Sequence, residues 1–221
     1  MLFDVHSHLV QTDNNQEIHI CNLIVTDSQS AIPDCGYFSA GIHPWYISED
    51  MDPAFENLRN ITTNERCLAI GECGLDRLKG PGLAVQEAIF RQQLLLAESL
   101  NKPVIIHSVR CFPELIRMKK ELAIHIPCIL HNFSGNQQQL QELIRHGFCF
   151  SVGIAALPHL IRNKSLSQIP LNLFFIETDE SLESLSFLYQ KIAFERQIAI
   201  SELESLISTN FHNIFLRNSI L

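Results

Sequence analysis

Histidine and carboxylate side chains stand at the ends of several short apolar runs in the sequence. They are His6, His8, Glu72, His107, His131 and Asp179. His6 and His8 are two residues apart, so on an extended segment both side chains point to the same side. Imidazole and carboxylate groups together suit zinc, manganese, iron or magnesium, and a carboxylate can bridge two ions. One such residue is usually an ordinary hydrogen-bonded side chain, whereas six at the ends of apolar runs predict a metal site.

The apolar runs themselves are rich in β-branched residues, and most are separated by helical patterns. They cover residues 2–5, 18–25, 37–42, 67–70, 104–106, 128–130, 148–152 and 173–176. Near-continuous apolarity over such lengths is typical of strands that are buried on both faces of a parallel sheet. Eight strands alternating with helices predict an α/β fold, the (β/α)8 TIM barrel, whose active sites lie at the carboxyl ends of the strands.

Helical periodicity is clearest in the second half of the chain. It covers residues 85–100, 113–122, 137–146 and 184–196. Ser201 and Glu204 have the spacing of a capping box, which predicts the start of a last helix.

The chain is short for a barrel, because 221 residues fall below the usual ~250. The shortfall lies in residues 9–17 and 26–36, which are too short or too polar for a full helix. We therefore predict one hydrolase barrel domain over residues 1–221, with the first two outer helices missing or reduced to single turns.

Composition narrows the class of protein. No apolar run reaches the ~18 residues of a membrane span, and residues 1–10 lack the basic region of a secretory signal. The seven cysteines form no C-x-x-C pair, which favours a reducing compartment and hence a cytoplasmic location. A net charge of −8 argues against a large basic nucleic-acid surface, although not against a nuclease whose metal ions supply positive charge.

Seven segments in order resemble the TatD-type metal-dependent deoxyribonucleases, a family of the amidohydrolase-like barrel superfamily. The segments are residues 4–9, 41–44, 69–76, 103–108, 131–135, 177–179 and 210–215. The resemblance implies two divalent ions (zinc, magnesium or manganese) as cofactors. It places His6, His8 and Asp179 on one ion and His107 and His131 on the other, with Glu72 bridging them. A shared carboxylate also suits a two-metal hydrolytic site with ions ~3.5–4 Å apart.

The same resemblance suggests roles in catalysis and substrate binding. Asp179 would be the general base that accepts the proton of the attacking water. His43 would contact substrate, although it could equally fix the turn at Pro44 and Trp45. Many family members carry an arginine two residues after the fifth-strand histidine. Here Arg110 stands one place later and is a candidate phosphate contact.

Two further cations, Arg77 and Lys79, follow the fourth predicted strand. Like Arg110, they could contact phosphate, or they could be ordinary solvated surface charges.

Three functions fit these features. The first is a phosphodiesterase that cleaves DNA, from a strand end. The second is hydrolysis of a small ester, amide or phosphoester on the same dinuclear site, because one barrel hosts many chemistries. The third is a non-catalytic binding protein, against which the intact set of ligands argues.

The second predicted strand also bears on assembly. Both of its faces carry apolar residues, so the outward face would leave an exposed patch where a helix normally packs. Either the last helix or a second subunit would cover it. We therefore expect a monomer or a weak homodimer.

Overall fold

The computed structural model describes residues 1–9, 16–34 and 36–216 of the chain. Eight parallel strands hydrogen-bond to one another in chain order. They are β1 (Leu2–Ser7), β2 (Glu17–Ile24), β3 (Tyr37–Gly41), β4 (Cys67–Asp76), β5 (Val104–Val109), β6 (Cys128–Leu130), β7 (Phe148–Val152) and β8 (Phe174–Ile176). A helix follows every strand from β3 onward, so the molecule is the predicted (β/α)8 barrel.

The ring of strands closes through the segment that follows β8. The backbone N–H of Asp179 donates to the carbonyl of His6 at 2.9 Å, and the N–H of His8 donates to the carbonyl of Asp179 at 3.0 Å. The buried carboxylate of Asp4 supports this seam by accepting from the Thr178 N–H at 3.1 Å and the Thr178 hydroxyl at 2.6 Å. Three of the predicted ligands therefore lie where the first and last strands meet.

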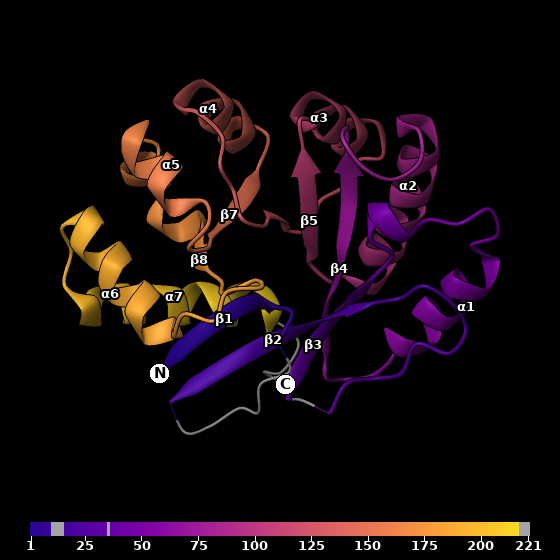
Figure 1. Ribbon diagram of the computed structural model, residues 1–221, viewed down its shortest axis with the longest axis horizontal. Helices are drawn as coiled ribbons and strands as arrows, with labels where there is room; N and C mark the ends of the chain where they lie inside the picture. Colours follow the sequence, from indigo (N-terminus) through magenta and orange to yellow (C-terminus); the bar gives the residue numbers. More distant parts are fainter. Residues whose placement is uncertain (10–15, 35, 217–221) are drawn as a thin grey trace.

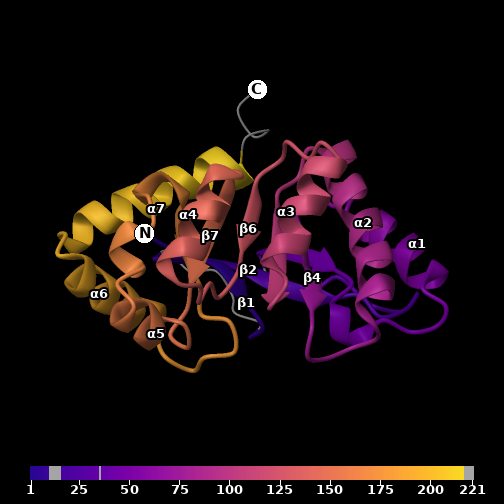
Figure 2. The same cartoon turned by 90° about the horizontal axis from the view of Figure 1, so that it is seen from above.

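The helices follow one another around the outside of the strands (Figures 1 and 2). They are α1 (Asp52–Ile61), α2 (Leu83–Leu100), α3 (Phe112–Glu121), α4 (Gln137–Arg145), α5 (Leu157–Arg162), α6 (Leu185–Arg196) and α7 (Ile200–Phe215). Three 3₁₀ turns, η1 (Pro44–Tyr46), η2 (Leu166–Gln168) and η3 (Leu171–Leu173), complete the connections. Among the helices of the described residues, none is long and apolar enough to cross a bilayer.

The prediction of missing outer helices is confirmed between β2 and β3. Residues 25–34 and 36, the described part of that connection, contain no helix. Most of the connection between β1 and β2, residues 10–15, lies outside the described residues.

The outward side of β2 is covered by α1, which follows β3. Cys21 and Val25 are buried in one apolar cluster with Leu58 of α1. The expected exposed patch on β2 is therefore wrong, because the sequence patterns did not reveal α1. The last helix packs against β1 instead, where the rings of Phe3 and Phe211 lie 4.6 Å apart. The expectation of a second subunit rested on that exposed patch, and the described residues of β2 form no such patch.

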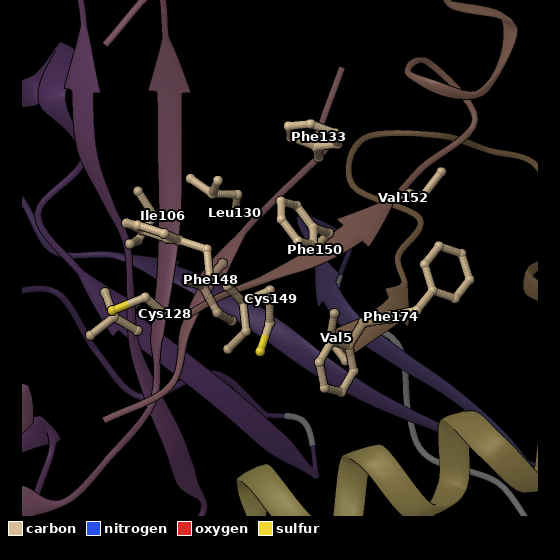
Figure 3. Close-up of a cluster of buried hydrophobic side chains, with 14 of the residues drawn as sticks. Val5, Ile106, Cys128, Leu130, Phe133, Phe148, Cys149, Phe150, Val152 and Phe174 are labelled. Carbon is tan, nitrogen blue, oxygen red and sulfur yellow. The ribbon is translucent and has the colours of Figure 1, made fainter. Parts of the chain in front are cut away.

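The main apolar core joins the strands to the surrounding helices. Phe150 of β7, Leu143 of α4 and Ile192 of α6 are all buried in it. Figure 3 shows part of this cluster, in which consecutive strands contribute Leu130, Phe150 and Phe174. Close packing of this kind fixes the strands and so the positions of the residues at their ends.

Candidate active site

The structure brings the six predicted ligands together at the carboxyl ends of the strands. His6 lies on β1 and His8 just after it, Glu72 on β4 and His107 on β5. His131 follows β6 directly, and Asp179 lies shortly beyond β8. Five of the six line one cavity of about 330 Å³, and the sixth, His6, is fully buried.

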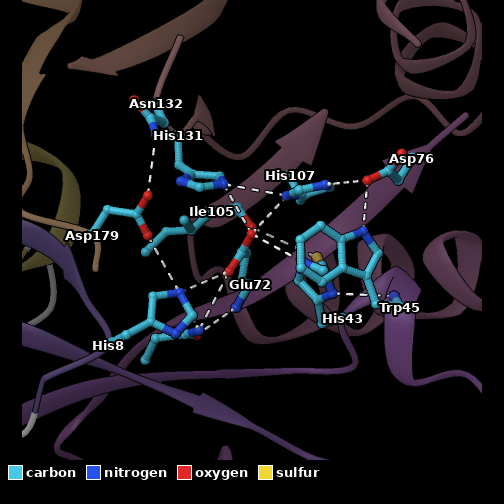
Figure 4. A network of polar contacts seen from close by, with 12 residues as sticks. His8, His43, Trp45, Glu72, Asp76, Ile105, His107, His131, Asn132 and Asp179 are labelled. Atoms are coloured by element: carbon cyan, nitrogen blue, oxygen red, sulfur yellow. Dashed lines mark hydrogen bonds and ion pairs between the residues drawn. The ribbon is translucent and has the colours of Figure 1, made fainter. Parts of the chain in front are cut away.

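Glu72 is at the centre of the group (Figure 4). Its Oε2 lies 3.4 Å from Nε2 of His6 and 3.3 Å from Nε2 of His8. Its Oε1 lies 2.9 Å from both Nδ1 of His107 and Nε2 of His131. The two oxygens of one carboxylate thus face two different pairs of predicted ligands, and Oε1 also faces Nε2 of His43 at 3.2 Å.

The backbone of β4 places Glu72 by approaching β5 closely. Gly71 has a φ of +141°, which side chains rarely allow, and a Cβ there would collide with the carbonyl oxygen of Ile105. The N–H of Glu72 then donates to Oδ1 of Asn22 on β2 at 2.9 Å. Contacts with β5 and with Asn22 of β2 therefore fix the backbone from which the Glu72 carboxylate extends.

Asp179 lies on the same side of the site as His6 and His8. Its Oδ1 is 3.8 Å from Nε2 of His6 and 3.5 Å from Nε2 of His8. Its Oδ2 accepts a hydrogen bond from Nδ2 of Asn132 at 3.1 Å. One carboxylate oxygen is thereby fixed and the other is left facing the histidines.

Charges within the cluster are strongly coupled. Burial would raise the pKa of the Glu72 carboxyl, but the surrounding histidines hold that pKa well below its usual range. Burial would lower the pKa of His131, but the carboxylates of Glu72 and Glu177 raise it well above its usual value. The hydrogen bond to Glu72 raises the pKa of His8. Protons therefore compete with a metal ion for these imidazoles, and metal affinity should rise with pH.

His6 shows that these residues fit a metal ion. Its side chain is fully buried, and within the described part of the chain neither ring nitrogen has a hydrogen-bond partner. Buried polar atoms without partners are rare because they are costly. Ligand atoms of His6, His8 and Asp179 lie within 4.8 Å of one another, and so do those of His6, Glu72 and His131. Nitrogen and oxygen donors of this kind suit a divalent ion.

Two carboxylates that had no role in the sequence-based prediction face the histidines. Oδ2 of Asp76 lies 3.1 Å from Nε2 of His107. Oε1 of Glu177 lies 3.4 Å from Nδ1 of His131 and accepts from the N–H of Asn132 at 2.5 Å. Such partners set which ring nitrogen is free to bind a metal. Both belong to the segments that carry the family resemblance, so the signal was present.

Asn22 was also missed. Its Oδ1 accepts from the N–H of Glu72, and its Nδ2 donates to Oε2 of the same residue at 3.4 Å. An amide side chain within a mainly apolar strand was the signal that could have revealed it.

The two predicted substrate contacts, His43 and Arg110, lie in different places. His43 lies in the cavity, with Nε2 3.2 Å from Oε1 of Glu72 and Nδ1 accepting from the N–H of Trp45 at 3.1 Å. Burial lowers the pKa of His43. Arg110 is exposed and lines a neighbouring depression rather than this cavity. Contact of either residue with substrate stays a prediction.

A parallel barrel with clustered histidines and carboxylates at its strand ends defines a class, the metal-dependent barrel hydrolases. The model of the TatD-related DNase family matches residues 3–216. The chain belongs to this family of metal-dependent hydrolases, which confirms the resemblance seen in the sequence segments.

Individual proteins agree with this assignment. An uncharacterized metal-dependent hydrolase of Buchnera aphidicola is 27% identical over 202 residues, covering 81% of this chain and 76% of that protein. The protein named 3'-5' ssDNA/RNA exonuclease TatD of Pectobacterium atrosepticum is 29% identical over 192 residues, covering 80% and 69%. The crystal structure of YjjV, a TatD homologue from Escherichia coli, has a TM-score of 0.81 at 20% identity, covering 97% of this chain and 98% of that one. This last likeness shows the fold.

Proposed function

We propose that the protein is a deoxyribonuclease that hydrolyses phosphodiester bonds from the end of a DNA strand, using two divalent ions. The observation that carries the proposal is that the two carboxylate oxygens of Glu72 face different predicted ligands. Oε2 faces His6 and His8, while Oε1 faces His107 and His131. A carboxylate placed between two sets of ligands is suited to bridging two ions.

The proposed ligands are those implied by the resemblance. His6, His8 and Asp179 would hold one ion, His107 and His131 the other, and Glu72 both. Two such ions, when bound, lower the pKa of water and neutralise the charge of a phosphoryl group. Zinc, magnesium and manganese all suit this donor set.

The chain's own residues supply the proton acceptor and its orientation. Burial and the nearby charge of Glu177 raise the pKa of Asp179, which makes its carboxylate a stronger proton acceptor. Asn132 orients that carboxylate by donating to Oδ2, so that Oδ1 faces His6 and His8, where an ion and its water would be held. Asp76 and Glu177, by facing one nitrogen of His107 and of His131, leave the second nitrogen of each ring directed to the cavity.

The substrate class rests on the family and on one relative. The relative from Pectobacterium atrosepticum is named for exonuclease action on single-stranded DNA and RNA. Phosphoryl transfer needs chiefly positioning and charge neutralisation, which a metal site provides even in an acidic protein. The alternative is hydrolysis of a small ester, amide or phosphoester, which the modest volume of the cavity, about 330 Å³, would also admit.

The test compares two kinds of substrate. Protein stripped with a chelator and reloaded with manganese, magnesium or zinc is incubated with end-labelled single-stranded DNA, and separately with chromogenic esters. We expect metal-dependent shortening of the DNA, which is lost in Glu72→Gln and kept in Glu56→Gln, an exposed glutamate of α1. Rapid ester hydrolysis without DNA cleavage would establish the alternative instead.

A further inference from the structure

The loop after β4 holds Lys79 in a fixed place beside the cavity. Oδ1 of Asp76 accepts from the backbone N–H groups of Leu78 at 2.7 Å and of Lys79 at 3.1 Å. The buried side chain of Gln86 donates to the carbonyl of Lys79 at 3.0 Å. At Gly80 the loop touches the backbone of Pro44, where a Cβ would collide with the carbonyl oxygen. Contacts at each of these positions restrain the backbone of the loop from which the Lys79 side chain extends.

The ammonium of Lys79 lies against Trp45, a residue that lines the cavity. Its Nζ lies 3.7 Å from the centroid of the Trp45 ring, the distance of a cation–π contact. Trp45 lines the cavity, and its indole N–H donates to Oδ2 of Asp76 at 2.6 Å. The same Asp76 oxygen faces His107 (Figure 4). One carboxylate thus fixes a predicted metal ligand, the aromatic wall and the lysine loop together.

The two other cations singled out from the sequence are placed differently. Arg77 forms an ion pair with Glu114 and donates through Nε to the carbonyl of Arg110 at 3.1 Å. Arg110 lines a separate depression. Lys79 takes part in no ion pair within the described part of the chain. An ammonium has three N–H donors, so contact with one ring face leaves donors for an anion.

The positive charge of Lys79 lies beside a cavity whose lining carries negative charge. The cavity lining includes the carboxylates of Glu72, Asp179 and Glu180, and no lysine or arginine among the described residues. A strand that enters this cavity brings further phosphates, and these need positive charge at its rim.

We propose that Lys79 binds the phosphate adjacent to the scissile one in single-stranded nucleic acid, with Trp45 as the platform that holds its ammonium for that contact. This inference rests on the proposed function. Lys79 would thereby favour polynucleotides over substrates that have a single phosphodiester.

The experiment measures steady-state kinetics of the metal-loaded protein on two substrates at several salt concentrations. One substrate is a short single-stranded oligonucleotide, and the other is a dinucleoside monophosphate, which has no adjacent phosphate. In Lys79→Gln we expect the KM for the oligonucleotide to rise roughly 3- to 10-fold at low salt with little change in kcat. The slope of log KM against log salt should flatten by about 0.7, the value of one lost contact to a single strand.

Matched variants separate this role from a structural one. Lys79→Arg keeps the charge and should stay close to wild type, and Arg77→Gln removes a charge from the same loop without the KM effect. The dinucleoside should be cleaved equally well by Lys79→Gln and wild type. An unchanged oligonucleotide KM and salt slope in Lys79→Gln would overturn the inference and leave the nuclease proposal standing, as would an equal loss of kcat on both substrates. A wild-type protein that cleaves neither substrate would overturn both proposals.

Discussion

Two of the proposed metal ligands face a carboxylate on the side of the ring away from Glu72. Asp76 faces Nε2 of His107, and Glu177 faces Nδ1 of His131. The nitrogens that remain, Nδ1 and Nε2 respectively, both face Glu72. The two rings therefore present different nitrogens to the same carboxylate, a detail that only the three-dimensional arrangement reveals.

At this scale the role of Asp179 is testable. In Asp179→Asn the amide can still coordinate weakly but cannot accept a proton, so we expect kcat on DNA to fall by about 10²–10⁴ while at least one metal ion stays bound. Kinetics and metal analysis of the same preparation measure the two quantities. Glu183→Gln, an exposed carboxylate nearby in the sequence, is the control. Near-normal turnover in Asp179→Asn would show that another group is the base.

His19 gives a prediction about stability and pH. Burial would lower the pKa of this buried imidazole, but the carboxylates of Asp4, 3.1 Å away, and Glu17 outweigh that effect and raise the pKa above 6.5. A pKa raised by folding adds stability that is full below the unfolded value and is lost as pH rises through the folded value. The stability advantage of wild type over His19→Gln should therefore be larger at about pH 6 than at about pH 8.5.

Urea unfolding of both proteins in the presence of a chelator measures this advantage at each pH. Comparing the two proteins cancels the titration of the other histidines. An advantage that is constant across this range, or that grows with pH, would contradict the assignment.

At the scale of elements, β2 shares an apolar cluster with α1, whereas the sequence patterns predicted that the last helix or a second subunit would cover it. α1 follows β3 but covers the outward face of β2 through Leu58, Phe55 and their neighbours. Its buried residues recur at helical spacing after Asp52 and Pro53, so the signal for this helix was in the sequence. Cys21 of β2 is buried in the same cluster as these residues, although the described part of the connection before β3 contains no helix.

The contribution of α1 can be measured with one cavity-forming substitution. Leu58 is fully buried, so Leu58→Ala should lower the free energy of unfolding by about 2–5 kcal/mol. Arg59→Ala, on the exposed side of the same helix, should change it by less than about 0.5 kcal/mol. Denaturant unfolding measures both, and metal content should be unchanged in both. Equal stability of the two variants would mean that α1 is not a necessary cover for β2.

Local sequence patterns predicted most of the strands and the later helices. The predicted runs 128–130 and 148–152 coincide with β6 and β7, and Ser184 caps α6 as its predicted start implied. β4 continues to Asp76, past the predicted end at residue 70, because Gly71 and Gly74 interrupt the apolar run without ending the strand. The capping box predicted at Ser201 and Glu204 is wrong.

The reason for that error lies in where the helix begins. α7 starts at Ile200, so Ser201 falls inside its first turn and no side chain caps it. Asn136 and Gln139 form a reciprocal capping box where α4 begins. Contacts between residues far apart in the sequence, such as Asp76 with His107, were equally out of reach of local patterns.

At the scale of the whole molecule, the barrel gathers side chains from five strands at one end. The seam between β8 and β1 brings Asp179 beside His6 and His8, and β4 carries Glu72 between them and the histidines that follow β5 and β6. The residue types and their order along the chain predicted this gathering, since the carboxyl ends of parallel barrel strands share one mouth. The central claim is that Glu72 unites these residues into one site for two ions.

Native mass spectrometry of the protein after chelation and reloading with manganese or zinc tests this claim most directly. We expect up to two ions on each wild-type chain, retention of both in Glu56→Gln, and loss of at least one in Glu72→Gln with an unchanged circular dichroism spectrum. Absence of bound ions from the wild-type chain under every loading condition, or equal metal content in Glu72→Gln and wild type, would contradict it.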